Sequence, residues 1–160
     1  MAVDSQLAAF VGTWRGEGQG TFPTMAPFTY EEEIRFEDLG GDVAYFQRAW
    51  DPASGTVLHT EAGIWRVIEI DPEIHVLVAT FAQPRRTEVA QGPISGGHTV
   101  LVSTNTAAVR GAKRVTTSQR TYRVNGDELA YEFVMATRYF SRPTRHLVGT
   151  LRRVAQPQSG

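Results

Sequence analysis

The sequence predicts an all-β protein, a single antiparallel up-and-down β-barrel of about ten strands with a short N-terminal helix. Three observations predict this fold. β-Rich segments follow one another at regular spacing from residue 13 to residue 154, with turn residues between them. Their connections are short and sequential, which favours a meander over a Greek key. One segment carries glycine along a whole face, and closing the sheet would remove the exposed edges of so β-rich a chain.

The first predicted element is a short helix within Asp4–Phe10. Asp4 or Ser5 is the expected N-cap, since both residue types accept hydrogen bonds from the first helical N–H groups. Leu7 and Phe10 are apolar, and we expect them to close one end of the barrel.

The first predicted strand, Thr13–Thr21, carries the most informative pattern in the chain. Because successive side chains of a strand point to opposite faces, one face reads Thr13, Arg15, Glu17, Gln19, Thr21. The other face reads Gly12, Trp14, Gly16, Gly18, Gly20. Repeated glycine marks a bend, a barrel corner or a close approach. A face that is bare except for one indole predicts the wall of a hollow barrel that holds a small molecule.

Nine further segments are predicted as strands on alternation and β-propensity. They are Tyr30–Leu39, Val43–Trp50, Leu58–Val67, Ile74–Ala82, Arg85–Ala90, His98–Thr106, Arg114–Asn125, Leu129–Thr137 and Arg145–Val154. Glycine, proline, aspartate and asparagine separate them, as in Asp51-Pro52 and Gly96-Gly97. Asn125-Gly126 between two β runs is the strongest hairpin signal.

Length and composition limit the kind of protein. The 160 residues fit one domain, residues 1–160, with an ordered core of about 6–154. The absence of cysteine excludes disulfides and thiolate chemistry and suits a reducing cytoplasm. A net charge of −1 argues against nucleic acid or an anionic membrane as partner. No signal peptide or membrane span is visible, so we expect a cytoplasmic protein, and the sequence leaves open a homodimer.

The four histidines show no metal-binding spacing, and no Gly-x-Ser-x-Gly motif occurs. His146 lies in a predicted closing strand, where alternation places it on one face with Val148 and Thr150. Two interpretations stay open. His146 is either a hydrogen-bonded histidine at the barrel rim or an axial ligand to a metal in the barrel mouth, since neutral imidazole is the common protein ligand of haem iron.

His59 and the acidic run Glu31–Glu33 also leave alternatives open. His59 is either an exposed residue at a strand start or a hydrogen-bond partner of Glu61, two residues on along the same face. The run Glu31–Glu33 is most simply a strand with two outer carboxylates. A buried glutamate paired with Arg35 or Arg48 is the alternative.

The glycine-rich run resembles the signature Gly-x-Trp-x-Gly-x-Gly-x-Gly-x-Tyr-Pro of the nitrobindins, here Gly12 to Pro23 with Phe22 in place of the tyrosine. The nitrobindins are small haem-binding β-barrels of the calycin and lipocalin kind, similar to fatty-acid-binding proteins. The resemblance continues in order through further blocks: Pro27-Phe28-x-Tyr30-x-Glu32, Trp50-Asp51, Leu58-His59-x-Glu61-x-Gly63-x-Trp65-Arg66, Gly126-Asp127-x-Leu129-x-Tyr131, Met135-Ala136-Thr137 and His146-Leu147.

The resemblance implies a ten-stranded barrel that holds one haem b per chain near its mouth. It implies that His146 is the proximal iron ligand and that Leu58 and His59 lie on the distal side, with Met135 near Leu58. Thr24 would lie close to the haem edge. The implied activity is the isomerisation of peroxynitrite to nitrate at ferric haem, with reversible binding of nitric oxide.

A lysine that some nitrobindins place near a haem propionate has no clear counterpart, so Ser118 or Arg120 would have to replace it. The rival function is an iron-free intracellular carrier of a fatty-acid-like or other apolar ligand, because one fold hosts many functions. Such a carrier would have inward arginines and an outward His146, and Arg120, Arg123 and Arg138 are its candidates.

Overall fold

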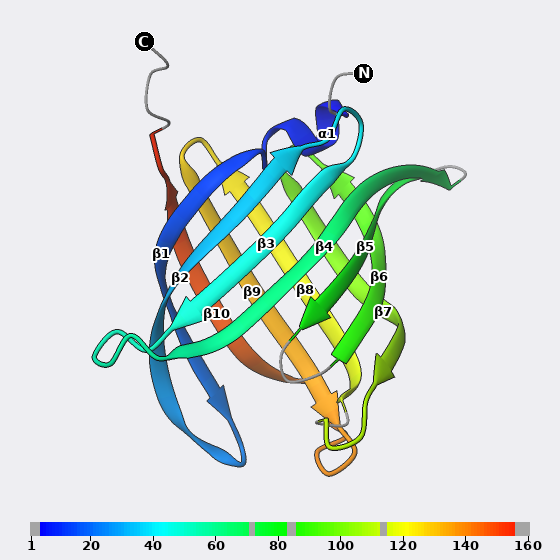
Figure 1. The fold of residues 1–160 in the computed structure, drawn as a ribbon. Coiled ribbons are helices and arrows are strands. Elements are labelled where there is room, and N and C mark those ends of the chain that lie inside the picture. The colour runs from blue at the N-terminus through cyan, green and yellow to red at the C-terminus, as the bar shows by residue number, and fades with distance from the viewer. Residues whose placement is uncertain (1–3, 71–72, 83–85, 113–114, 156–160) are drawn as a thin grey trace.

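The computed structural model describes residues 4–70, 73–82, 86–112 and 115–155, and it contains a closed barrel of ten antiparallel strands (Figure 1). The elements are α1 (Ser5–Ala8), β1 (Gly12–Phe22), β2 (Met25–Asp38), β3 (Val43–Trp50), β4 (Val57–Ile70), β5 (Glu73–Ala82), β6 (Arg86–Ser95), β7 (His98–Ala108), β8 (Val115–Asn125), β9 (Glu128–Thr137) and β10 (Thr144–Arg153). Each strand pairs with the next, and β10 closes on β1. The predicted fold class is therefore confirmed. Within the described part of the chain, no helix is long and apolar enough to cross a membrane.

Several strands are longer than the sequence predicts, and two of them, β2 and β6, extend by five residues at one end. β2 begins at Met25 rather than Tyr30, because Phe22 and Met25 already pair across a tight turn. β6 continues to Ser95 rather than ending at Ala90, although Gly92 and Pro93 follow. A methyl group at Gly92 would overlap the backbone of β7, so this glycine allows two strands to approach closely instead of ending one.

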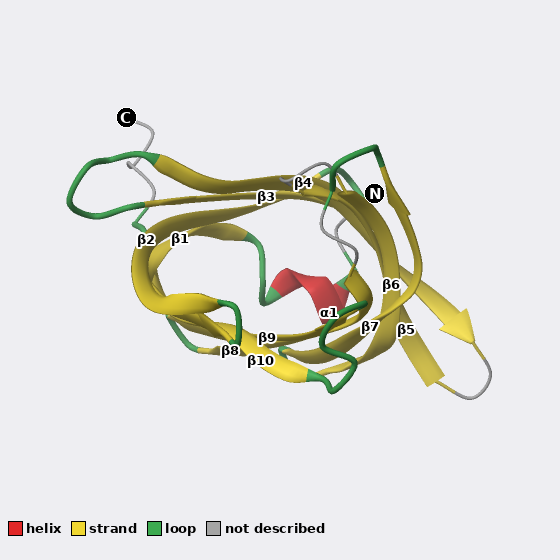
Figure 2. Ribbon diagram, turned by 90° about the horizontal axis from the view of Figure 1, so that it is seen from below, coloured by secondary structure: helices red, strands yellow, loops and turns green. Residues whose placement is uncertain are grey.

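The helix closes one end of the barrel, as Figure 1 shows, and Figure 2 looks toward it from the opposite end. Asp4 is the N-cap and accepts a hydrogen bond from the Gln6 backbone at 2.8 Å. Leu7 and Phe10 are fully buried, which confirms their predicted position. Burial of one such side chain contributes roughly 1.5–3 kcal/mol. The Trp14 indole N–H donates to the Phe10 carbonyl at 2.8 Å, so the first strand is bonded to this cap.

The glycine face of β1 is not bare, and this part of the sequence interpretation is wrong. A methyl group at Gly18 would overlap the ring of Tyr30, and one at Gly20 would overlap the ring of Phe28. These two pairs lie opposite each other in the β1–β2 register. The glycines therefore provide room for aromatic side chains of the neighbouring strand.

Candidate functional site

The imidazole of His146 lies at a β-bulge near the start of β10. Arg145 pairs with Val134 of β9, but Leu147 pairs with Phe133, so His146 is an extra residue in β10. A bulge redirects the side chain that it carries. The strict alternation that grouped His146 with the outward residues of β10 therefore does not hold.

The start of β10 lies at the end of the barrel opposite α1 (Figure 1). Three phenylalanine rings lie close to the His146 imidazole there. The centroid of the His146 ring lies 5.5 Å from Phe22, 6.1 Å from Phe133 and 6.4 Å from Phe28. Phe22 and Phe133 are buried and form one apolar cluster with Met135. Met135 therefore lies in the apolar cluster that contacts the imidazole, and its predicted place near Leu58 on the distal side stays a prediction.

A backbone carbonyl fixes the tautomer of His146. The Thr21 oxygen lies 2.9 Å from Nδ1. Because a carbonyl can only accept, Nδ1 carries the proton and donates it, and the lone pair of the neutral ring is on Nε2. Thr21 is also where the β1–β2 register shifts. Sequence reasoning left this partner unidentified, because a backbone atom has no sequence signal.

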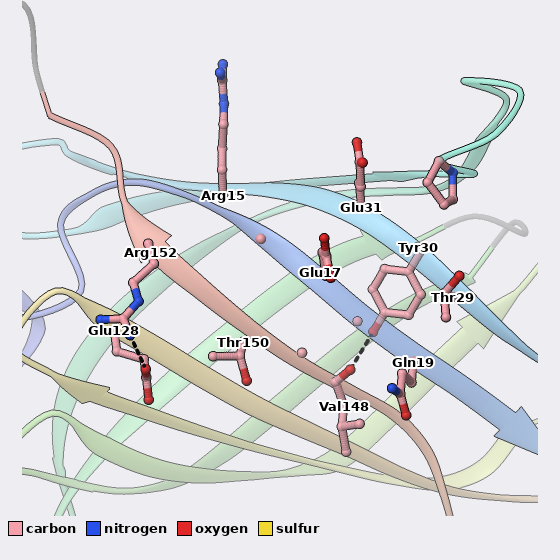
Figure 3. A pocket seen from close by; sticks show the side chains of 14 residues that line it. Arg15, Glu17, Gln19, Thr29, Tyr30, Glu31, Glu128, Val148, Thr150 and Arg152 are labelled. Carbon is pink, nitrogen blue, oxygen red and sulfur yellow. Dashed lines mark hydrogen bonds and ion pairs between the residues drawn. The ribbon is translucent and has the colours of Figure 1, made fainter.

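A depression of about 670 Å³ lies beside His146 and includes Phe28 and Thr21 in its wall. Its volume falls within the roughly 300–1,000 Å³ of small-molecule sites. A second depression, of about 760 Å³, lies on the outer side of β1, β2 and β10 (Figure 3). Its wall is mainly exposed polar side chains such as Arg15 and Glu17, and it is not in contact with His146. Both walls contain exposed polar side chains, and neither includes the buried rings of Phe22 and Phe133, so the candidate site for a bound group is the apolar cluster beside the imidazole.

The other residues predicted near the haem occupy different positions. Thr24 is exposed in the turn between β1 and β2, two residues after buried Phe22. Leu58 is 46% exposed at a register shift between β3 and β4. Their roles stay predictions.

His59 is the first member of a largely buried ionic network. Of the two interpretations of His59, the structure therefore shows the hydrogen-bond partner of Glu61. Its Nε2 lies 3.0 Å from an oxygen of buried Glu61. Arg120 binds Glu61 through both terminal nitrogens and also contacts Glu88, with Nη2 at 2.8 Å. Burial alone would raise the pKa of the Glu61 carboxyl, but Arg120 outweighs it and holds the pKa well below the usual range. The group is therefore an ionised carboxylate at neutral pH.

The other carboxylate on Arg120 is also fully bonded. Ser118 donates to Glu88 at 2.9 Å, and Arg86 lies 3.2 Å from it. The guanidinium of Arg120 lies over the Phe133 ring at 5.0 Å, which places this network next to the apolar cluster around His146. A haem-propionate contact by Arg120 or Ser118 stays a prediction, and in this structure both side chains are bonded to carboxylates.

Glu32 is the buried carboxyl of the acidic run, but its partners are not arginines. Gln47 donates to Oε2 at 2.6 Å, and the hydroxyl of Tyr131 donates to the same oxygen at 3.0 Å. Glu31 and Glu33 bind Trp50 and Arg15 instead, so the two outer carboxylates are confirmed. Burial raises the pKa of Glu32 to about 7.

Sequence reasoning did not find the aromatic partners of Glu32. The sequence did hold a signal that Glu32 points inward, because it alternates along β2 with Tyr30 and Ile34, and all three share the inward face. Which phenols approach the carboxyl depends on the register of β9, which the sequence does not give.

A closed ten-stranded barrel with an apolar opening, and with an imidazole held there in one tautomer, defines a small-molecule-binding β-barrel with one candidate metal ligand. The chain belongs to the family described as "THAP4-like, heme-binding beta-barrel domain", whose model matches residues 5–153. This confirms the resemblance to the haem-binding nitrobindins, and haem is the cofactor that the family description names.

Curated relatives match nearly the whole chain. "Peroxynitrite isomerase 1" of Rhodococcus jostii is 40% identical over 155 residues, which cover 94% of this chain and 84% of the relative. "Peroxynitrite isomerase 2" of Mycobacterium ulcerans is 36% identical and covers 89% of both chains. The crystal structure of Rv2717c from M. tuberculosis superposes with a TM-score of 0.84 at 30% identity, covering 96% of this chain and 99% of that one.

Proposed function

We propose that the protein binds one haem b through Nε2 of His146 and isomerises peroxynitrite to nitrate. The observation that carries this proposal is the hydrogen bond from His146 Nδ1 to the Thr21 carbonyl. Histidines that bind metals donate their other ring N–H to such an acceptor, which orients the ring and raises its basicity. The family and the relatives described above support the same cofactor and activity.

The residues present fit a haem. The ligand is a neutral imidazole, and the surrounding side chains of Phe22, Phe133 and Met135 offer a flat macrocycle an apolar surface. Ferric haem supplies a Lewis-acidic centre for the rearrangement of peroxynitrite into its isomer nitrate. The phenylalanines exclude water, and the carbonyl of Thr21 keeps the proton on Nδ1. We assign Leu58, His59 and Thr24 to the surroundings of the bound group, as the resemblance implies.

The same apolar surroundings support reversible binding of nitric oxide. Few side-chain donors lie in the cluster of Phe22, Phe133 and Met135. The polarity of a haem pocket decides which diatomic ligands it stabilises, and bound oxygen depends more on hydrogen-bond donors than nitric oxide does.

The rival function as an iron-free fatty-acid carrier is less well supported. Its requirement is an inward arginine that can receive a carboxylate. Arg120 is buried, but Glu61 and Glu88 already neutralise it, and Arg123 and Arg138 are exposed. A fatty-acid head group would therefore meet two buried carboxylates.

A haemin titration tests the proposal. The wild-type chain should develop the Soret band of a histidine-bound haem, and His146→Ala should lose it. His98→Ala is the matched control, since His98 begins β7 next to the turn that packs against the α1 end. An unchanged Soret band in the His146 variant would remove this residue as ligand. Stopped-flow decay of peroxynitrite then tests the activity, and a rate equal to that of buffer would leave only a binding role.

We also propose that the partners are small diffusible molecules and that the protein acts in the cytoplasm, without nucleic acid or membrane. The balanced net charge and the lack of cysteine support this. A homodimer is compatible with the sequence, and sedimentation velocity measures it directly.

A further inference from the structure

Four of the five tyrosines lie inside the barrel, and two of them bond to each other beside a carboxyl group. The hydroxyls of Tyr30 and Tyr131 are 2.6 Å apart, and Tyr131 donates to Glu32 Oε2 at 3.0 Å. Both phenols and the carboxyl are almost fully buried. The fifth tyrosine, Tyr139, is 85% exposed.

The hydrogen bonds in this group have a definite direction. An ionised carboxylate only accepts, so the Tyr131 proton points to Glu32. Tyr30 is then the donor toward Tyr131, with the Val148 carbonyl as its second acceptor at 3.2 Å. Among the described residues, Glu32 Oε1 has no hydrogen-bond partner, so the carboxyl retains an oxygen that is able to hold a proton.

Ring contacts connect this group to the proposed haem ligand. The Phe28 ring lies 6.4 Å from His146 and 5.9 Å from Tyr30. One phenylalanine therefore separates the imidazole from the first phenol. Tyr131 continues the series toward Tyr122, at 6.0 Å between ring centroids.

We propose that Tyr131, with Glu32 as its proton acceptor and Tyr30 as its second phenol, is an internal one-electron donor that reduces nitrogen dioxide radical. The proposal rests on the proposed function, because peroxynitrite releases this radical when its O–O bond breaks homolytically and the fragments escape. In the step, one electron passes from the phenol to the radical and gives nitrite. The O–H bond of Tyr131 breaks, its proton passes to Glu32, and a neutral phenoxyl radical remains.

The chemistry of the site supports this role over plain packing. A phenol is a practical one-electron donor only when a base takes its proton, and Glu32 is within hydrogen-bond distance. If these side chains served only to pack the barrel, phenylalanines and an apolar residue in place of Glu32 would fill the same space. Burying polar groups is costly unless they are fully bonded. Tyr30 then stabilises the phenoxyl oxygen of Tyr131, because its O–H still points there.

The titration of Glu32 depends on groups from several strands. Its own strand supplies Tyr30, and β9 supplies Tyr131. Gln47 of β3 donates a hydrogen bond to the carboxyl. Glu61 and His59 of β4 act on it electrostatically, and Glu61 is itself paired with Arg120 of β8. Burial dominates and raises the pKa to about 7, so the ionised fraction rises about tenfold between pH 6 and pH 8.

The experiment generates nitrogen dioxide radical by pulse radiolysis of nitrite in the presence of the protein and detects phenoxyl by freeze-quench electron paramagnetic resonance. All variants carry Tyr139→Phe, which removes the exposed competitor. This background should retain the phenoxyl signal, and Tyr131→Phe should lose it. Peptide mass spectrometry should find 3-nitrotyrosine at Tyr131 or Tyr30, although both are buried and direct attack favours exposed rings.

A second arm measures pH dependence and keeps the proposal testable if Tyr131→Phe does not fold. In the Tyr139→Phe background the phenoxyl yield should rise up to about tenfold from pH 6 to pH 8. Glu32→Gln should show a low yield without that rise. A yield that is independent of pH and unchanged in Glu32→Gln would overturn the proposal. So would a signal that disappears with Tyr139→Phe alone.

The radical is produced without haem, so the two proposals fail separately. Loss of haem binding in the wild-type chain would refute the proposed function while the phenoxyl measurement still reports on Tyr131. In the haem-loaded protein, peroxynitrite should produce the same nitrated peptides. Nitration confined to Tyr139 would show that the internal phenols donate no electron.

Discussion

Replacing Glu32 with glutamine should remove a large part of the pH dependence of stability. Burial raises the pKa of this carboxyl from 4.5 to about 7, so the folded state holds the proton more tightly than the unfolded state. The stability from this group is fully present below pH 4.5 and is lost as the pH rises through 7. Since each pH unit is worth about 1.4 kcal/mol, the difference is about 3 kcal/mol.

Urea denaturation at a series of pH values between 4.5 and 9 measures this prediction. The free energy of unfolding of wild type should fall by about 3 kcal/mol relative to Glu32→Gln over that range. Glu37→Gln is the control, because Glu37 lies on the same strand but is about half exposed, with a side-chain exposure of 51%. Parallel curves for wild type and Glu32→Gln would refute the buried, high-pKa carboxyl. A divergence of similar size in the control would show that the effect is general.

Three further substitutions test the packing around the site. Gly149→Ala should destabilise the fold by about 1–3 kcal/mol, because its methyl group would overlap the Tyr131 ring, and the midpoint of thermal unfolding measures this. Glu61→Gln should cost about 3–5 kcal/mol by leaving Arg120 incompletely neutralised, and the measurement is urea unfolding at pH 7. A loss below 1 kcal/mol would contradict the pair's burial. Trp14→Phe should cost about 1–3 kcal/mol, since a buried carbonyl loses its donor, and an unchanged unfolding midpoint would contradict that bond.

The sequence predicted the barrel because its information is local. Alternation and turn residues locate strands, and sequential hairpins leave few ways to connect them. The haem ligand came from the family resemblance, since alternation alone grouped His146 with Val148 and Thr150 and left its role open. One extra residue in β10 changes that orientation, and no residue type in Arg145-His146-Leu147 signals it.

The partners of the buried groups could not be predicted for a different reason. Glu32 was identifiable as an inward residue from its parity with Tyr30 on β2. Its contact with Tyr131 joins two residues that are 99 positions apart in the sequence. Registers across a closed barrel accumulate over every intervening pair of strands, so a residue's distant partners follow only from the complete structure.

The glycine-rich strand and the candidate haem ligand are two parts of one arrangement. Gly18 leaves room for the ring of Tyr30, and Gly149 on the adjacent strand leaves room for Tyr131 and Glu32. These two glycines face each other in the β1–β10 register, so the phenols reach the carboxyl only because both strands lack side chains there. The same two strands continue to the open end, where β1 supplies the Thr21 carbonyl that orients the histidine of β10. The space that the glycine pattern indicated is therefore occupied by phenols, and the strand's direct contribution to the haem site is a backbone oxygen.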